Sequence, residues 1–260
     1  TRSLVGSEMC IRDSPLSFNG ADPAIARITD IQDNSFSLFL QEPEYKDEFH
    51  TQESLSYLVL EAGTWSLEDG TILEVGNLDT NSITTSAEWE SIDFNSDFQQ
   101  TPAILSQVQT YNGNQFVRTR QNSFSSDGFQ LAMEEEEALK PTGHVTETLG
   151  WLAIESGSGS WDGLDYQSGH LASDHNWYTK DFSQSFEESP NLFASLASFY
   201  GSDSAGLRYR NLNSSQVEIK VEEDQSLDNE IGHVREIVDF LAIAGSGDLS
   251  ATAYDPLSSF

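Results

Sequence analysis

The feature that most constrains this chain is an internal repeat with a spacing of 88 positions. The recurring pairs are Trp89 and Trp177, Pro102 and Pro190, Gly113 and Gly201, and Arg120 and Arg208. A third, truncated copy lies upstream, where Arg27, Phe36 and Glu42 each stand 93 positions before a counterpart in the next copy. A repeat of this length is a whole domain and not a solenoid unit of about 20–50 residues. An array of small domains favours binding or display over one buried catalytic centre.

The repeat divides the 260 residues into segments. We expect a truncated first repeat at 15–75, a second repeat at 76–162 and a third repeat at 163–250, with 251–260 as the start of a further segment. Each full repeat is long enough for one modest hydrophobic core, although it is near the small end for a stable domain.

The net charge excludes some partners. The chain carries 43 acidic against 12 basic residues, for a formal charge of −31. A field of this sign repels nucleic acid and anionic membrane surfaces. No apolar run approaches the roughly 20 residues that a membrane-spanning helix needs. We therefore expect no nucleic acid and no membrane insertion, and we interpret the dispersed acids as a solvated, salt-tolerant surface.

Alternating polar and apolar residues predict half-buried antiparallel strands over 116–120, 128–134, 216–222 and 34–40. Each repeat closes with a richer apolar run, at 57–60, 151–154 and 240–243, which is typical of a strand buried on both faces. Gly/Ser clusters follow these runs and are interpreted as boundaries and linkers. No stretch has helical periodicity. The expected fold is all-β, with tandem antiparallel β-sandwich domains of about 88 residues.

The first residues have no counterpart in the other repeats. Residues 3–14 resemble the translated sequencing adapter found at the ends of environmental gene fragments. We therefore expect 1–14 to be a non-native leader that forms no strand of the first sandwich. The one cysteine of the chain, Cys10, lies in this segment, so no disulfide framework is expected.

The order of the conserved positions within each repeat resembles a known family. The second repeat reads Trp89, Ile92-Asp93-Phe94, Thr101-Pro102-Ala103-Ile104-Leu105 and Gly150-Trp151-Leu152-Ala153-Ile154. This pattern is similar to the H-type lectin domain of snail agglutinins and discoidins, over 79–155 and 167–243 with a tail at 25–60. It also resembles tandem repeats of large exported proteins of marine bacteria. The resemblance implies antiparallel sandwiches, commonly homotrimeric, that bind N-acetylgalactosamine and related sugars.

Arginine recurs at one place in the repeat. Arg118 and Arg120 match Arg208 and Arg210 within a slip of one or two residues, and Arg27 matches Arg120. One interpretation is a cross-strand ion pair with the following glutamates, Glu134 or Glu222. The alternative is recognition of sugar hydroxyls, uronates or sulfates by the guanidinium groups, for which bidentate geometry is suited.

A His-x-x-Glu motif occurs three times, beginning at His50, His144 and His233. On a strand, residues i and i+3 point to opposite faces, so a histidine satisfied at a loop–strand corner is favoured over a zinc site. Calcium suits the abundant carboxylates better, but Glu134-Glu135-Glu136-Glu137 lacks the spacing of a calcium loop. We expect no cofactor, with Ca²⁺ as the one metal for which the ligand chemistry is present.

The densest polar–aromatic cluster is His175-Asn176-Trp177-Tyr178. Trp177 either packs in the core, as its recurrence as Trp89 favours, or forms a platform on which a pyranose ring stacks. No nucleophile elbow, phosphate loop or distinguished carboxylate pair is present, so no enzyme is expected.

These observations favour a carbohydrate-binding repeat array on an exported or cell-surface bacterial protein. Its partner would be a glycan or polysaccharide, bound weakly by each domain and more tightly by the array. The candidate ligand-binding residues are Arg118, Arg120, Trp177, Tyr178, Arg208 and Arg210. The alternative is a structural or adhesive spacer without a small ligand.

Overall fold

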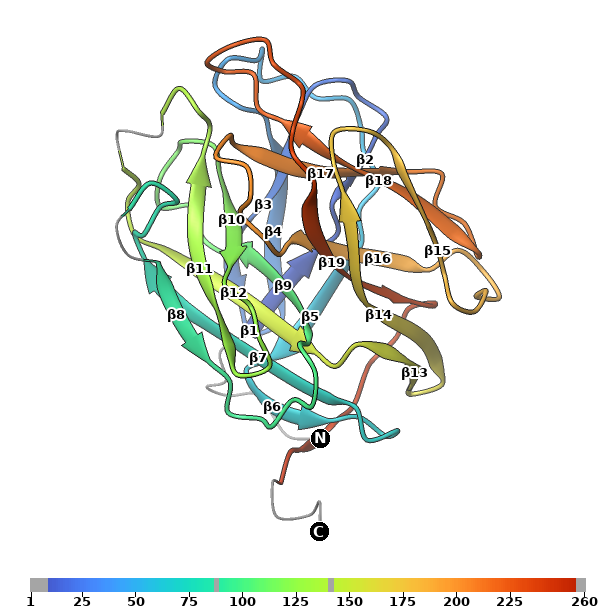
Figure 1. Cartoon of the computed structure of the whole chain (residues 1–260). Helices are drawn as coiled ribbons and strands as arrows, with labels where there is room; N and C mark the ends of the chain where they lie inside the picture. Colours follow the sequence, from blue (N-terminus) through green and yellow to red (C-terminus); the bar gives the residue numbers. More distant parts are fainter. Residues whose placement is uncertain (1–8, 87–88, 140–142, 256–260) are drawn as a thin grey trace.

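The fold is built from β-strands joined by turns and loops. The computed structural model describes residues 9–86, 89–139 and 143–255, and within these residues it contains twenty strands and no helix. The strands of the first repeat are β1 (Met9–Asp13), β2 (Leu16–Ser17), β3 (Ile25–Gln32), β4 (Ser35–Gln41) and β5 (Tyr57–Glu61). In Figure 1 the strands are coloured along the sequence, from blue at the N-terminus to red at the C-terminus.

The second repeat is a two-layer antiparallel sandwich. One sheet has the order β6 (Gly63–Ser66), β7 (Ile72–Thr80), β12 (Glu147–Ile154) and β9 (Ala103–Val108). The facing sheet has the order β8 (Glu90–Asp93), β11 (Gly128–Glu135) and β10 (Val117–Asn122). At the edge of the first sheet, β20 (Thr252–Ala253) pairs with β6.

The third repeat has the same two sheets. Its first sheet is β13 (Gly157–Trp161), β14 (Leu164–Ser173), β19 (Glu236–Ile243) and β16 (Asn191–Leu196). Its second sheet contains β15 (Tyr178–Asp181), β18 (Gln216–Glu223) and β17 (Ala205–Arg210). The expected all-β class with tandem antiparallel sandwiches is confirmed. The apolar runs at 151–154 and 240–243 lie in β12 and β19, each of which pairs on both edges.

Strand pairing places the repeat boundaries earlier than the sequence pattern indicated. The hairpin of β6 and β7 joins β12 of the second repeat, and the hairpin of β13 and β14 joins β19 of the third. The second repeat therefore begins near residue 63 and not 76, and the third near 157 and not 163. The Gly/Ser stretch at 157–161 is a strand and not a linker, because its backbone groups pair with β14.

The expectation that residues 1–14 form no strand is wrong for the part of that segment that the structure describes. β1 pairs with β5 along its whole length, and Cys10 and Ile11 are fully buried. The strand occupies the position of β9 and β16, since Arg12 opposes Leu58 just as Leu105 opposes Leu152. The strand completes the ladder with its backbone, and it adds the side chain of Cys10 to the shared core.

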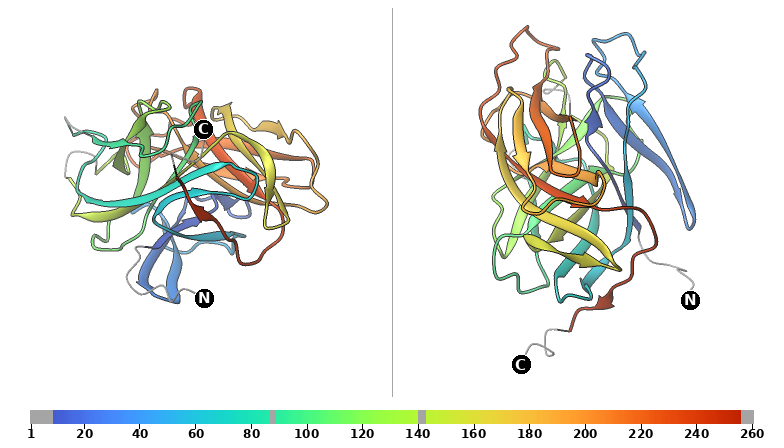
Figure 2. Two further views of the ribbon diagram at one scale, coloured as in Figure 1. Left: turned by 90° about the horizontal axis from the view of Figure 1, so that it is seen from below. Right: turned by 90° about the vertical axis from the view of Figure 1, so that its right-hand side faces the viewer.

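The three repeats share a core and are not independent beads. One apolar cluster combines Cys10 and Leu60 of the first repeat with Leu105 of the second and Phe193 of the third. Three further clusters fill the individual sandwiches. Seen from below in Figure 2, the chain forms three lobes around this shared centre. The repeats thus pack with approximate threefold symmetry within a single chain.

Candidate functional site

Each junction between neighbouring repeats is organised around one buried glutamate. Between the second and third repeats it is Glu236, which is fully buried at the start of β19. Its carboxylate accepts hydrogen bonds from the Ser198 hydroxyl, from Tyr200 N at 3.0 Å and from Gly201 N at 2.9 Å. These hydrogen bonds offset the free-energy cost of removing the carboxylate from water.

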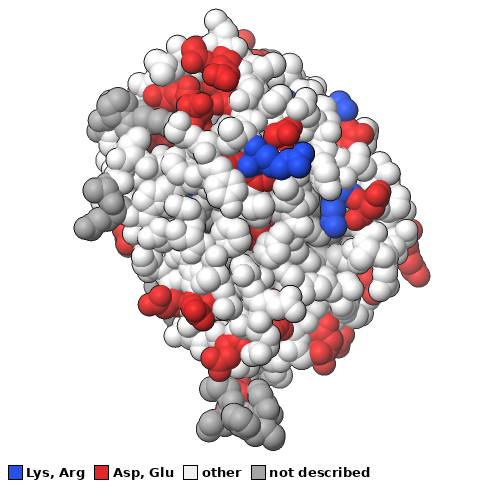
Figure 3. Space-filling view, viewed as in Figure 1, with Lys and Arg blue, Asp and Glu red and all other residues white. Residues whose placement is uncertain are grey.

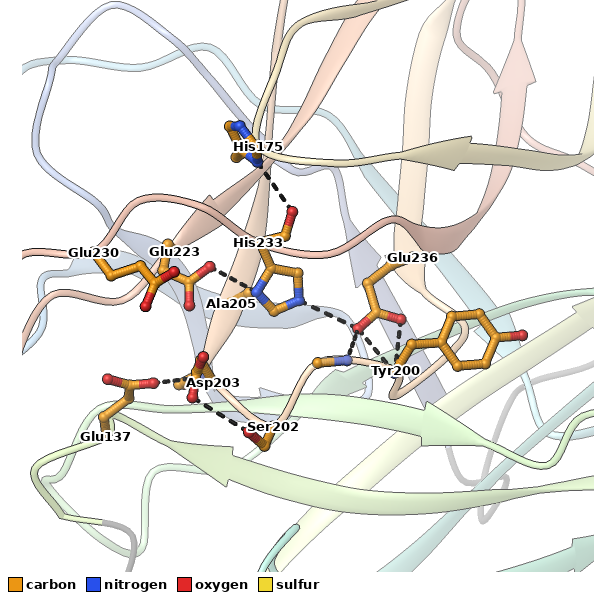
Figure 4. A network of polar contacts seen from close by, with 12 residues as sticks. Glu137, His175, Tyr200, Ser202, Asp203, Ala205, Glu223, Glu230, His233 and Glu236 are labelled. Atoms are coloured by element: carbon orange, nitrogen blue, oxygen red, sulfur yellow. Dashed lines mark hydrogen bonds and ion pairs between the residues drawn. The ribbon is translucent and has the colours of Figure 1, made fainter.

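His233 connects this glutamate to a second carboxylate. Its Nε2 lies 3.2 Å from Glu236 Oε1, and its Nδ1 lies 2.7 Å from Glu223 Oε2, as Figure 4 shows. Burial by itself disfavours the charged imidazole, but the hydrogen bonds to the two carboxylates outweigh burial and raise the pKa of His233 to about 9. A side chain at Gly201 would meet this ring at 2.8 Å, so the recurring glycine makes room for the histidine.

The His-x-x-Glu motif does not lie within one strand as expected, so its two side chains do not point to opposite faces. His233 precedes β19, and Glu236 is its first residue, so the two side chains turn toward each other. Burial opposes ionisation of Glu236, but the hydrogen bond from His233, the charge of Arg120 and the backbone donors together lower the pKa of Glu236 to about 2. The histidine is satisfied at a loop–strand corner, as the sequence favoured.

An arginine from the preceding repeat completes the junction. Arg120 Nη2 on β10 lies 3.1 Å from Glu236 Oε1 and also donates to the Ser198 carbonyl at 3.2 Å. Its Nη1 lies 3.4 Å from Glu134 on the neighbouring strand. The guanidinium carbon is 5.0 Å from the centre of the Phe199 ring. Arg120 is fully buried, so these contacts take the place of water.

The same roles recur at the other two junctions. Between the first and second repeats they are filled by Glu147, His144, Glu135, Arg27 and Tyr111. Between the third and first repeats they are filled by Glu53, His50, Glu42, Arg208 and Phe18. The arginine-to-glutamate distances at these two junctions are 3.5 and 2.9 Å. The contacts run in one direction, from first to second to third and back to first, so the ring of repeats is closed.

The structure corrects the interpretation of the arginine position. Only Arg27, Arg120 and Arg208 are equivalent, because Arg118 opposes Glu134 in the ladder whereas Arg210 opposes Glu218. Arg120 and Arg208 are buried between repeats, where solvent ligands do not reach them, and cross-strand pairing with Glu134 or Glu222 is present for both. Arg118 is 13% exposed and donates to the Ser204 hydroxyl at 2.8 Å.

Two of the other candidate residues, Trp177 and Arg210, come together on the surface above the junction of the third and first repeats. Arg210 lies over the Trp177 ring at 4.2 Å, and Lys220 lies 5.3 Å from the same ring. Phe18 of the first repeat meets Trp177 edge to face, with ring centres 5.3 Å apart. Trp177 is half-buried, while Tyr178 beside it is exposed. We call Phe18, Trp177, Arg210 and Lys220 the Trp177 patch. Tyr178 opposes the buried Ile219 in the ladder, so its side chain lies on the other face of the sheet and outside this patch.

Two members of the Trp177 patch, Phe18 and Lys220, were not among the sequence candidates. Phe18 occupies the position of Tyr111 and Phe199, which the spacing of 93 and 88 positions would have revealed. Lys220 has no counterpart of its type in the second repeat, where Ala132 opposes Arg120. No repeat signal therefore marks it.

A polar groove of about 870 Å³ lies at the junction of the first and second repeats. Tyr111 contributes an aromatic ring that is 39% exposed. Hydrogen-bonding side chains line most of the rest, among them Asp30, Asn77, Asp79 and Asn112, beside a few apolar residues. The groove therefore combines one aromatic surface with several donors and acceptors.

The acidic residues are dispersed, with one close group among the described residues. Glu137, Asp203 and Glu223 have carboxylate oxygens within 4.8 Å of one another, and Figure 4 shows them beside His233. Glu223 already bonds His233, and Glu137 accepts from Ser204 N at 3.1 Å. On the face in Figure 3, acidic residues are scattered and the few basic groups border them.

Comparison with known proteins identifies one curated relative, at 30% sequence identity. Halomucin of Haloquadratum walsbyi (strain DSM 16790 / HBSQ001) is 30% identical over 236 residues, which are 89% of this chain and 2% of that protein. The chain thus spans a small fraction of the length of the relative that it matches. No family model and no solved structure matches. In the described part of the chain, no helix has the length and apolar character needed to cross a membrane.

Proposed function

We propose that this chain is a carbohydrate-binding unit of an exported or cell-surface protein and that it has no catalytic role. The relative named as a mucin supports an extracellular, surface-associated location. The resemblance of the repeats to H-type lectin domains supports a glycan as the ligand. The closed ring of three repeats is consistent with that resemblance, because it gives one chain the arrangement of a trimer.

The observation that carries the proposal is the Trp177 patch. It joins aromatic rings to two cations on a chain whose net charge is −31. Aromatic faces pack against the C–H faces of pyranoses, and guanidinium groups bind carboxylates and sulfates in a bidentate manner. Glu218 pairs with Arg210 at 2.5 Å, so a bound anion would compete with this carboxylate. The patch fits a glycan that carries uronate or sulfate groups.

The groove beside Tyr111 is a second place for the same function. Its acidic and amide side chains suit the hydroxyls of a neutral sugar, and they repel an anionic one. The two surfaces would therefore select different glycans, which makes them separable by experiment.

The test is retention on immobilised polysaccharides. We expect Trp177→Ala with Arg210→Ala to abolish retention on alginate, a uronate polymer, while the fold persists by circular dichroism. Trp89→Ala is the matched control, because Trp89 holds the same repeat position and contacts Phe199, but no cation of the described residues lies over its ring. Tyr111→Ala with Asp79→Asn tests the groove on a neutral galactan column.

Retention of wild-type protein on neither column, or retention that both double variants preserve, would contradict carbohydrate binding at these surfaces. A glycan array with wild-type protein extends the search to other sugars. Failure there as well would favour the alternative, a structural or adhesive spacer whose buried junctions serve rigidity alone.

A further inference from the structure

The first repeat has an open edge in each of its two sheets. In the complete repeats, β12 pairs with β7 as well as β9, and β19 pairs with β14 as well as β16. Within the described residues, the equivalent strand β5 pairs with β1 alone. Likewise β11 and β18 pair on both edges, whereas β4 pairs with β3 alone. Both sheets therefore lack the same neighbour on the same side.

The uncovered strand carries apolar side chains that are buried elsewhere. Tyr57 and Val59 on β5 are 62% and 41% exposed. Their counterparts in the second repeat, Trp151 and Ala153, are 7% and 0% exposed. An exposed strand edge with apolar side chains is a template for pairing with another strand.

An aromatic pair at this edge indicates what the missing neighbour provides. Phe36 and Tyr57 meet edge to face with ring centres 5.3 Å apart. The equivalent pair in the second repeat, Phe129 and Trp151, is 5.6 Å apart and contacts a third ring, Phe94, at 5.8 and 6.0 Å. In the first repeat, Phe36 and Tyr57 correspond to Phe129 and Trp151, but among the described residues no ring takes the place of Phe94.

In the second repeat, the covering strand and this third ring belong to one unit. Glu74 on β7 accepts hydrogen bonds from Asn95 N at 2.9 Å and from Ser96 N at 3.0 Å. These bonds attach the segment of Phe94 and Phe98 to β7, and the two rings lie 5.0 Å apart. The third repeat has an equivalent contact. There the Gln167 side chain accepts a hydrogen bond from Ser183 N at 2.7 Å.

We propose that the open face of the first repeat, formed by β5 and β4, binds a polypeptide segment of the same repeat type, equivalent to residues 72–98. Its first strand would pair antiparallel with β5, as β7 pairs with β12, and its second strand would pair with β4, as β8 pairs with β11. The occupant is identified by the two complete repeats of the same molecule, in which β7 with β8, and β14 with β15, cover the corresponding edges. This interaction is independent of glycan binding.

The geometry at Gly76 makes the recognition selective. The Trp151 ring lies across this glycine, and a Cβ there would stand 2.5 Å from the ring. The exposed Tyr57 holds the position of Trp151, so the incoming strand needs a glycine where the tyrosine ring would lie. A residue with a branched side chain at that place would block pairing.

The experiment is binding of a labelled synthetic peptide with the sequence of residues 72–98, followed by fluorescence anisotropy and by hydrogen exchange of the protein. We expect saturable binding and slower exchange of the amides of β5 and β4. The Gly76→Val peptide should lose at least tenfold in affinity, and the Phe94→Ala peptide should bind more weakly than the parent peptide.

Protein variants locate the surface. Val59→Lys should weaken binding at least tenfold, whereas Val234→Lys, at a valine that is 51% exposed before β19, should leave it unchanged. Circular dichroism of both variants separates lost binding from lost fold. Absence of binding by the parent peptide, or equal binding by the Gly76→Val peptide, would overturn the proposal. A concentration-dependent dimer that protects β5 without peptide would overturn it in favour of a second copy.

Discussion

Arg208 Nη2 lies 2.9 Å from Glu53 Oε1, and the two residues are 155 positions apart in the chain. Both side chains are buried, and this contact joins the third repeat to the first. Arg27 with Glu147, and Arg120 with Glu236, join the other neighbours in the same sense. Since each repeat gives an arginine to the next and receives one from the previous repeat, the ring closes without a free end.

Removal of the closing arginine should destabilise the whole molecule. We expect Arg208→Met to lower the free energy of unfolding by about 3–5 kcal/mol, because it removes the guanidinium partner of the buried Glu53. The matched control is Arg210→Met on the same strand, where an exposed pair with Glu218 is lost and stability should barely change. Urea denaturation measures both variants, and equal effects would contradict a structural role for the ring.

Stability should fall at alkaline pH through the junction histidines. The pKa of His233 is raised from 6.5 to about 9, and that of His144 is also raised. Protons are therefore held more tightly in the folded state, so this contribution is complete below about pH 6.5 and is lost as the pH rises to about 9. We expect the thermal midpoint to decline across this window.

The loss of stability at acidic pH and a histidine variant test the same junctions; we call the acidic part of the stability curve the acid limb. The pKa values of Glu147 and Glu236 are lowered from 4.5 to about 2, so their contribution is present above pH 4.5 and is lost as the pH falls toward 2. His233→Gln should reduce the alkaline slope and weaken the part of the acid limb that comes from Glu236, whereas the part that comes from Glu147 should remain. A midpoint that stays constant between pH 6.5 and 9 would show that the histidines are not charged in the fold.

Arg12 is poorly suited to its place, and its replacement should stabilise the protein. It holds the position of Leu105 and Phe193, and its Nε and Nη1 atoms have no hydrogen-bond partner. Burial lowers the pKa of Arg12 to about 10 and raises that of the neighbouring Asp13 to about 7. We expect Arg12→Leu to raise the free energy of unfolding by about 1–3 kcal/mol, since buried unsatisfied donors are removed. A loss of stability at pH 6 would show that the arginine has a favourable role.

The shared core predicts a single unfolding event. Phe193 is 1% exposed and belongs to the apolar cluster that joins all three repeats. We expect calorimetry to show one transition, and Phe193→Ala to lower its midpoint without splitting it, at a cost of about 3–5 kcal/mol. Two or three resolved transitions in the wild-type protein would indicate independent domains instead.

The sequence by itself determined the local structure and the repeat. Period-two alternation placed strands such as β4 and β18, because their two faces meet different surroundings. It also placed β11, although that strand is buried on both faces. The apolar runs marked β12 and β19 for the opposite reason, because both faces of these two strands are buried. The recurrence of Arg120 and Arg208, and of His-x-x-Glu, marked positions that matter. Trp177 and Arg210, which were separate candidates in the sequence, meet at the surface.

Only the tertiary structure decided what those positions do. Arg120 and Glu236 are 116 positions apart, and nothing local shows that the arginine of one repeat meets the glutamate of the next. Burial converts that meeting from an exposed ion pair into a structural junction, and burial is a property of the packed ring. The strand at Met9–Asp13 follows the same logic. Its pairing with β5 and the burial of Cys10 and Ile11 arise only in the folded chain, although Arg12 leaves two buried donors without a hydrogen-bond partner.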